Sequence, residues 1–185
     1  LDDVFDLVKK VRTQSQIPLV LMLSVTLIHK YGIDRFASRA AAVGVDGVIP
    51  PDLPPEEAKS ISKILRTHKL STIFLAAPTS TPARLRAIAR ASTGFIYLVS
   101  VTGITGARKS VAKNLPEFIR RVRRVTKLPL VVGFGISTSE QVRDVAKLAD
   151  GVVVGSALVS RLAQNRPRGM NNAIRFMRSL SISIR

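Results

Sequence analysis

The chain alternates between segments with helical periodicity and short, continuous apolar runs. In residues 2–12, apolar side chains recur at positions 4, 5, 7, 8 and 11, the spacing of one face of a helix. The same spacing predicts further helices at 33–43, 54–68, 81–91, 115–125, 138–148, from 156 onward, and at 170–180. Continuous apolar runs predict strands at 19–23, 45–49, 72–77, 95–100, 130–132 and 151–154.

Six apolar runs, each followed by a helical segment, predict an α/β fold. Continuous apolar strands are typical of parallel strands that are buried on both faces. Strands that alternate with helices form a parallel sheet, either doubly wound or closed into a barrel. No Pro- or Gly-rich linker interrupts residues 1–185, so we expect a single domain.

Membrane and export segments are not expected. The longest apolar stretch, Ile17–Ile28, contains Pro18 and is too short to span a bilayer as a helix. Residues 1–16 hold three aspartates and lack the apolar core of a signal peptide. These features predict a soluble, cytoplasmic protein.

The composition is strongly basic and contains no cysteine. The chain has 29 Lys and Arg against 12 Asp and Glu, a formal net charge of +17. Without cysteine there is no disulfide framework, no thiolate zinc site and no thiol nucleophile. Aromatic residues make up 5% of the chain and none interrupts the basic run 120–124, which argues against stacking of single-stranded bases. We expect that run to be an exposed helix face, and we do not expect nucleic acid as a partner.

Glycines follow three successive predicted strands. Gly103–Gly106 follows the strand at 95–100, Gly133–Gly135 the next, and Gly155 with Ser156 the last. Glycine lets backbone N–H groups approach an anion closely, and Ser156 opens a helix whose N-terminus favours phosphate. Barrels often bind phosphate in the loops after their last two strands. The pattern predicts a phosphate site.

Two other candidate motifs carry less chemistry. Gly103–Ser110 is close to a nucleotide-binding P-loop, but Arg108 stands where that loop requires its second glycine. His29 and His68 are isolated, so no metal site is expected.

Taken together, the motifs resemble one family, the α subunit of tryptophan synthase. The matching stretches are Leu21-Met22, His29–Ile33, Gly44–Ile49, Pro51–Glu57, Ala77–Thr79, Gly94–Tyr97, Gly103–Arg108, Gly133–Ile136 and Asp150–Ala157. Their order and spacing cover nearly the whole chain.

The resemblance implies a (β/α)8 TIM barrel that acts as a lyase in tryptophan biosynthesis. The family cleaves indole-3-glycerol phosphate by a retro-aldol reaction into indole and glyceraldehyde 3-phosphate. The indole is channelled to a β subunit, which holds pyridoxal phosphate, in an α2β2 heterotetramer; the α chain itself carries no cofactor. The implied substrate-binding residues are Tyr97, Thr105, Gly106, Phe134, Gly135, Gly155 and Ser156. The implied contacts with the β subunit are Asp52, Leu53 and Pro54.

The resemblance also identifies what this chain lacks. The family's first strand, first helix and second strand would all precede Leu1, which leaves six of the eight βα units. The family's catalytic Glu and Asp would fall in that part, so no catalytic residue is assigned here. Protonation of the indole C3 and stabilisation of the ring N–H are tasks for such a carboxyl pair. Residues 23–27 also depart from the family's usual Thr-Tyr-Tyr-Asn-Pro.

Two alternatives remain open from the residues. The chain could be a non-catalytic, truncated barrel that acts as a basic interaction or scaffold protein. It could also be another phosphate-binding barrel enzyme.

Overall fold

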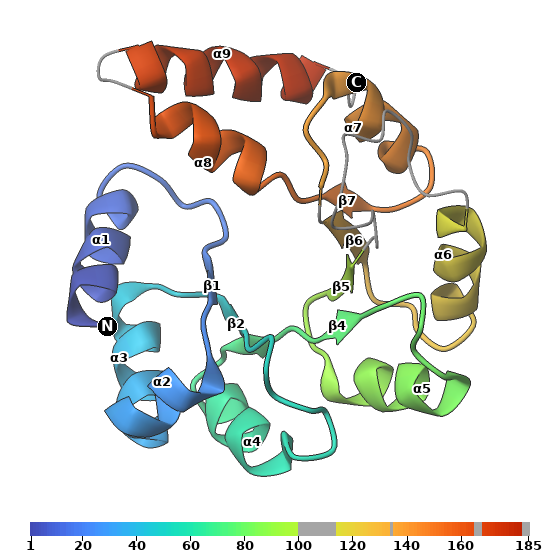
Figure 1. The fold of residues 1–185 in the computed structure, drawn as a ribbon. Coiled ribbons are helices and arrows are strands. Elements are labelled where there is room, and N and C mark those ends of the chain that lie inside the picture. Colours follow the sequence, from blue (N-terminus) through green and yellow to red (C-terminus); the bar gives the residue numbers. More distant parts are fainter. Residues whose placement is uncertain (100–113, 134, 165–167, 183–185) are drawn as a thin grey trace. The chain divides into compact units, whose positions relative to one another are not determined.

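The computed structural model describes residues 1–99, 114–133, 135–164 and 168–182 (Figure 1). They form an α/β fold with two compact units. The N-terminal unit comprises Leu1–Leu75 and Ala83–Ile96, and the C-terminal unit comprises Ala76–Pro82 and Tyr97–Arg185.

The N-terminal unit contains a three-stranded parallel sheet in the order β1-β2-β3. Its strands are β1 (Val20–Met22), β2 (Gly47–Ile49) and β3 (Ser71–Thr72). Its helices are α1 (Asp2–Arg12), α2 (Val25–Tyr31), α3 (Ile33–Val43), α4 (Lys59–Thr67) and α5 (Pro82–Ala91), whose first residue is assigned to the other unit. The central strand β2 is buried throughout. Helices α1 and α3 lie side by side (Figure 1), and the rings of Phe5 and Phe36 are 5.8 Å apart between them.

Arg12, the last residue of α1, connects that helix to the turn after α3. Its Nε and Nη2 donate to the carbonyl oxygen of Gly44 at 2.9 and 2.6 Å, and Nη2 lies 2.6 Å from a carboxylate oxygen of Asp46. Gly44 has a φ of +91°, which glycine adopts without strain and which ends α3 as the sequence predicts. The carboxylate of Asp46 also accepts the backbone N–H of Leu19, just before β1.

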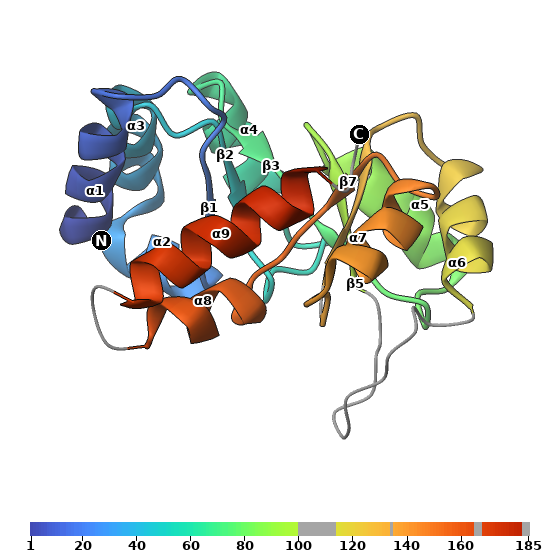
Figure 2. The same cartoon turned by 90° about the horizontal axis from the view of Figure 1, so that it is seen from above.

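The C-terminal unit contains a four-stranded sheet in the order β4-β5-β6-β7. Its strands are β4 (Leu75–Ala76), β5 (Ile96–Val99), β6 (Leu130–Gly133) and β7 (Gly151–Val152), of which β4 and β5 begin in residues of the other unit. Its helices are α6 (Leu115–Arg123), α7 (Ser139–Ala146), α8 (Ser156–Leu162) and α9 (Arg168–Ile182). Helices α8 and α9 lie alongside each other in both views (Figures 1 and 2). The Arg161 guanidinium stacks over the Phe176 ring there, 3.6 Å from its centroid.

Most predicted elements are present, and the differences have local causes. The predicted helix at 54–68 begins only at Lys59, because residues 54–57 form turns. Glu56 therefore does not lie in the first helical turn; its carboxylate pairs with Arg84 of α5 instead. The predicted strand at 72–77 is divided into β3 and β4, which pair in different sheets.

The strand β1 is less buried than its apolar sequence predicts. Its neighbour β2 is fully buried, whereas Met22 at the end of β1 is 51% exposed. The reason is topological, since β1 lies at the edge of its sheet and pairs with β2 alone among the described strands. The sequence also misses α2, which begins after Ser24, whose hydroxyl accepts the N–H of Thr26.

The basic run of α6 agrees with the predicted exposed face except at one arginine. Arg120, Arg123 and Arg124 are exposed, but Arg121 is half-buried. The Arg121 guanidinium donates to the carbonyl oxygens of Pro78 and Ser80, at 3.1 and 2.6 Å. These two hydrogen bonds connect α6 to the loop after β4.

Within the described residues, no helix has the length and apolar character needed to cross a bilayer. The same residues contain no cluster of three or more His, Cys, Asp or Glu side chains of the kind that holds a metal ion.

Candidate functional site

The predicted substrate-binding residues that the structure describes lie on neighbouring strands of the C-terminal unit or in the loops that follow them. Tyr97 is on β5, Gly135 follows β6 by two residues, and Gly155 follows β7 by three. In the sheet β5 is next to β6, and β6 pairs with β7 in parallel. Because parallel strands end at the same edge of a sheet, the loops after β6 and β7 leave from one edge. Loops at the carboxyl ends of such strands are where ligands bind in α/β folds.

Tyr97 is held against the last residue of β6. The side chain is 4% exposed, and its hydroxyl lies where a side chain on Gly133 would have to be. A Cβ placed on Gly133 would come within 2.0 Å of the Tyr97 Oη and 2.5 Å of its Cζ. Glycine at position 133 is thus what lets the phenol cross to the neighbouring strand.

Burial raises the pKa of the Tyr97 hydroxyl above its ordinary value. The phenol therefore stays protonated at neutral pH and can donate a hydrogen bond, but it cannot serve as a base there. The other described members of the predicted site, Gly135, Gly155 and Ser156, have no acidic or basic side chain. Tyr97 and these three residues are therefore suited to binding a ligand through hydrogen bonds and not to transferring protons.

The loop after β7 leaves open space beside its glycine. Apart from its two neighbours in the chain, no described residue has an atom within 4 Å of a Cβ placed on Gly155. Gly155 precedes α8, no side chain caps that helix, and Ser156 at its first position is exposed. The first backbone N–H groups of a helix have no partner within the helix. The open space and these N–H groups make the start of α8 a candidate anion site.

The loop after β6 has a different requirement for glycine. Gly135 is exposed and has a φ of +78°, a conformation that side-chain-bearing residues rarely adopt. Three other predicted site residues, Thr105, Gly106 and Phe134, lie outside the described residues.

The predicted partner-contact residues Asp52, Leu53 and Pro54 lie in the N-terminal unit, in the loop after β2. The Asp52 carboxylate accepts the Ser24 hydroxyl at 2.5 Å and the backbone N–H of Val25 at 2.8 Å. These hydrogen bonds hold the pKa of Asp52 below its ordinary value, with the Ser24 bond as the larger cause. Asp52 is exposed, Pro54 is half-buried and Leu53 is buried. The loop after β2 is therefore hydrogen-bonded to the start of α2 through Asp52.

Sequence reasoning missed two residues that shape these regions. Gly133 was predicted to follow the strand as part of the phosphate-binding glycines, yet it is the last residue of β6 and accommodates a tyrosine from β5. Ser24 stands in the segment that departs from the family pattern, and it both caps α2 and donates to Asp52. Neither contact has a signal in the sequence, because each depends on which strands become neighbours.

Comparison with known proteins gives one consistent family. The model of the tryptophan synthase alpha chain family matches residues 1–182. A tryptophan synthase alpha chain from Opitutus terrae is 49% identical over 163 residues, covering 88% of this chain and 61% of the relative. One from Pelobacter propionicus is 44% identical over 185 residues, covering 100% of this chain and 69% of the relative.

A solved structure agrees with these relatives. The tryptophan synthase complex from Pyrococcus furiosus matches with 36% identity and a TM-score of 0.89, over 98% of this chain and 73% of that one. The match confirms the predicted fold class, an α/β fold of the TIM-barrel type. The chain spans about three fifths of the length of the Opitutus relative. The chain belongs to the tryptophan synthase alpha chain family.

Proposed function

We propose that this chain is the substrate- and partner-binding part of a tryptophan synthase α-type lyase. The reaction is the retro-aldol cleavage of indole-3-glycerol phosphate into indole and glyceraldehyde 3-phosphate. The observation that carries the proposal is the pair of glycine loops after β6 and β7, with open space beside Gly155, in a chain of this family.

The substrate phosphate binds at the loops that follow β6 and β7. Gly135 and Gly155 bring backbone N–H groups to the ligand, and Ser156 adds those at the start of α8. Thr105, Gly106 and Phe134 complete the pocket in this proposal. Tyr97 holds its neutral phenol at the reacting end of the substrate, as a donor.

Cleavage of the carbon–carbon bond requires a proton at the indole C3 and help at the ring N–H. The described site residues supply neither, since Tyr97 stays protonated and the others have no titratable group. In this proposal the Glu of the family's second strand and the Asp of the loop after it perform these two tasks. The residues described here bind the phosphorylated substrate.

A β subunit receives the indole. A related structure is described as the tryptophan synthase a2b2 complex of Pyrococcus furiosus. In our proposal this chain forms the same heterotetramer in the cytoplasm, pyridoxal phosphate is held by the β subunit, and the α chain needs no cofactor of its own. The loop Asp52–Pro54, fastened to α2 through the Asp52 carboxylate, is the proposed contact.

The phosphate site is tested by binding of glycerol 3-phosphate to the 15N-labelled chain. We expect amide shifts that follow the loops after β6 and β7. Gly155→Asp places a carboxylate in the open space and should remove the shifts by repulsion. Ser160→Asp adds the same charge at an exposed position of α8 and should leave binding unchanged. Equal binding by the two variants would overturn the site assignment.

The lyase activity is tested by indole release from indole-3-glycerol phosphate. We expect no release by this chain alone. Release should appear when the chain is joined to the N-terminal segment of the Opitutus terrae alpha chain, which supplies the missing strands. Replacing the carboxylates of that segment by amides should abolish it again. A joined, folded protein that binds glycerol 3-phosphate but releases no indole would refute the proposed reaction.

The partner contact is tested by titration with a tryptophan synthase β chain. Asp52→Asn removes the charge and keeps one oxygen that can accept the Val25 N–H. Its NH2 group comes to lie beside the Ser24 hydroxyl, whose oxygen can accept from it, so the loop should keep its shape. We expect it to weaken the complex several-fold, whereas Asp3→Asn, on the exposed side of α1, should not. Equal affinities would exclude the Asp52 carboxylate from the interface.

A further inference from the structure

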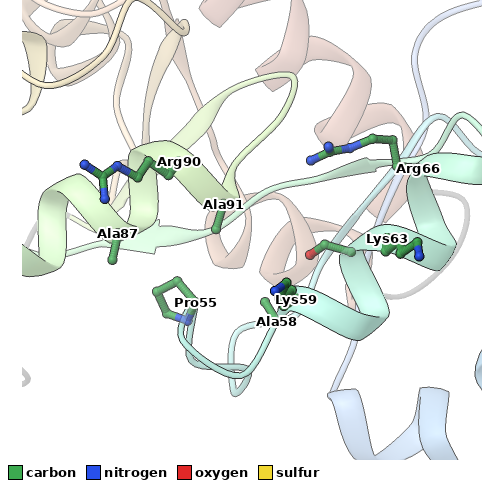
Figure 3. A pocket seen from close by; sticks show the side chains of 9 residues that line it. Pro55, Ala58, Lys59, Lys63, Arg66, Ala87, Arg90 and Ala91 are labelled. Atoms are coloured by element: carbon green, nitrogen blue, oxygen red, sulfur yellow. The ribbon is translucent and has the colours of Figure 1, made fainter.

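The N-terminal unit has a groove between two of its helices that is not part of the proposed lyase site. It lies between α4 and α5 and has a volume of about 500 Å³. Figure 3 shows Ala87 and Ala91 of α5 on one side, with Pro55 and Ala58 before α4 on the other. Ala58 is 1% exposed, and with Pro55, Ala87 and Ala91 it gives the groove an apolar part of its lining.

Four cationic side chains line the same groove. Lys59, Lys63 and Arg66 come from α4 and Arg90 comes from α5. The Arg66 side chain extends over the groove toward α5 (Figure 3). Among the described residues, none of the four forms an ion pair with a carboxylate.

The residues that line the groove do not compensate the charge of these four cations. No acidic residue lines it. The nearby carboxylate of Glu56 is already paired with Arg84 at the start of α5. Four unpaired cations in one concave surface repel one another, and an anion relieves that repulsion.

Ser62 provides an independent sign of a missing ligand. This residue lines the groove and is 9% exposed, and its Oγ is inaccessible and has no hydrogen-bond partner among the described residues. A buried hydroxyl without a partner destabilises the folded chain, because it has lost its hydrogen bonds to water and gained none in exchange. A serine in a helix commonly satisfies its hydroxyl by bonding the carbonyl oxygen four residues earlier, and this one does not.

The start of α4 points to the same charge. The residue before the helix is Ala58, which has no side chain to cap it, so the first N–H groups keep their partial positive charge. Lys59 is the first helical residue and lies at the groove. An uncapped helix start, four cations and an unpaired serine hydroxyl thus surround one apolar hollow.

We propose that this groove binds a small amphipathic anion. The anionic group, a carboxylate, sulfonate or phosphate, lies between Arg66 and the start of α4. The Ser62 side chain, whose Oγ is buried in the free chain, rotates toward this group and donates its hydroxyl to it. The apolar body of the ligand packs on Ala58 and Ala91. The volume is that of small-molecule sites, about 300–1,000 Å³. No residue of the groove belongs to the proposed lyase site, so the two sites can be tested separately.

The test uses the complete 15N-labelled chain and three probes: naphthalene-1-sulfonate, uncharged 1-naphthalenemethanol and inorganic phosphate. We expect the sulfonate to shift the amide signals of α4 and α5. The alcohol lacks the charge and phosphate lacks the apolar body, so each should bind at least about tenfold more weakly. Shifts confined to other elements, or equal binding of the sulfonate and the alcohol, would overturn the proposal.

A matched pair of variants locates the charge. Arg66→Glu reverses a cation that reaches over the groove, and Arg86→Glu makes the same change at an exposed position of α5 outside it. We expect Arg66→Glu to weaken sulfonate binding about tenfold or more and Arg86→Glu to change it less than about twofold. Equal affinities of the two variants would refute the assignment.

Ser62→Ala separates a ligand contact from a packing role. Removal of a buried, unpaired hydroxyl should leave the unfolding midpoint unchanged or raised. Binding of the sulfonate should nevertheless weaken several-fold, because the ligand loses a donor. Unchanged affinity in Ser62→Ala would remove this residue from the proposed site and with it the argument that the groove is built for an anion.

Discussion

The contact between Tyr97 and Gly133 gives the sharpest prediction for this structure. In Gly133→Ala the new methyl group would be 2.0 Å from the Tyr97 Oη, 2.5 Å from Cζ and 2.9 Å from Cε1. Ordinary contacts of a Cβ are 3.4–4 Å, so the ring must move by more than an ångström. Tyr97 is 4% exposed and its neighbours Ile96 and Leu98 are fully buried, so the strand has little room to give way.

Overpacking of this kind in a close-packed interior costs about 1–3 kcal/mol. We expect Gly133→Ala to lower the free energy of unfolding by that amount, measured by urea denaturation. Adding Tyr97→Phe should recover part of the loss, because phenylalanine lacks the oxygen that makes the closest contact.

Gly155→Ala is the matched control, because its added Cβ would lie more than 4 Å from every described residue other than its chain neighbours. We expect this variant to keep its free energy of unfolding and to lose affinity for glycerol 3-phosphate. A purely structural defect would instead lower the free energy of unfolding. If Gly133→Ala unfolds at the same urea concentration as the unchanged chain, the packing argument is wrong. Equal losses of stability in both alanine variants would contradict it as well.

Three further changes should affect stability in predictable directions, each measured by urea denaturation. Arg12→Met removes the charged hydrogen bonds to the Gly44 carbonyl and should cost about 1.5–3 kcal/mol; a change below the error of the measurement would contradict this role. Thr138→Ala removes the side-chain cap of α7 and should cost about 1 kcal/mol, with Thr138→Ser close to the unchanged chain. Asp150 accepts the Leu130 N–H and pairs with an arginine, so its pKa in the folded chain lies below the ordinary 3.8. The Asp150 carboxylate therefore stabilises the folded chain above pH 3.8, and this stabilisation is lost as the pH falls further. Asp150→Asn should lower the free energy of unfolding at pH 7 and make it less dependent on pH under acidic conditions. An unchanged pH dependence would refute this.

Family membership changes how the basic composition is understood. The relatives are alpha chains of tryptophan synthase. Family membership therefore gives no reason to interpret the net charge of +17 as a sign of nucleic-acid binding. The structure assigns individual arginines to structural contacts, such as Arg12 at the end of α1 and Arg121 beside the loop after β4. The cations of the α4–α5 groove are different because none of them forms an ion pair with a described carboxylate, and they motivate the anion site.

The glycine motifs illustrate how far the candidate site could be predicted. The motif after β7 predicted a loop that leads directly into a helix, and α8 begins at Ser156. The strand before the second motif was predicted to end at residue 132, but Gly133 still belongs to β6. Spacing along the chain identified the loops, whereas the role of Gly133 depends on a side chain from another strand.

The sequence by itself determined the features that arise within a few residues. The periodicity of 2–12 determined α1, Gly44 ended α3, and Thr138 capped α7 together with Gln141, three residues later. These features are local because helical hydrogen bonds and caps join residues three or four positions apart.

Only the tertiary structure decided which distant residues meet. Ser24 and Asp52 are 28 positions apart, and Tyr97 lies against Gly133 only because β5 and β6 are neighbours in their sheet. The same is true of the groove, whose cations come from two helices that the sequence does not place together. Side-chain patterns specify which face of an element is buried, but the contacts across that face depend on strand order and register, which arise when the whole core packs.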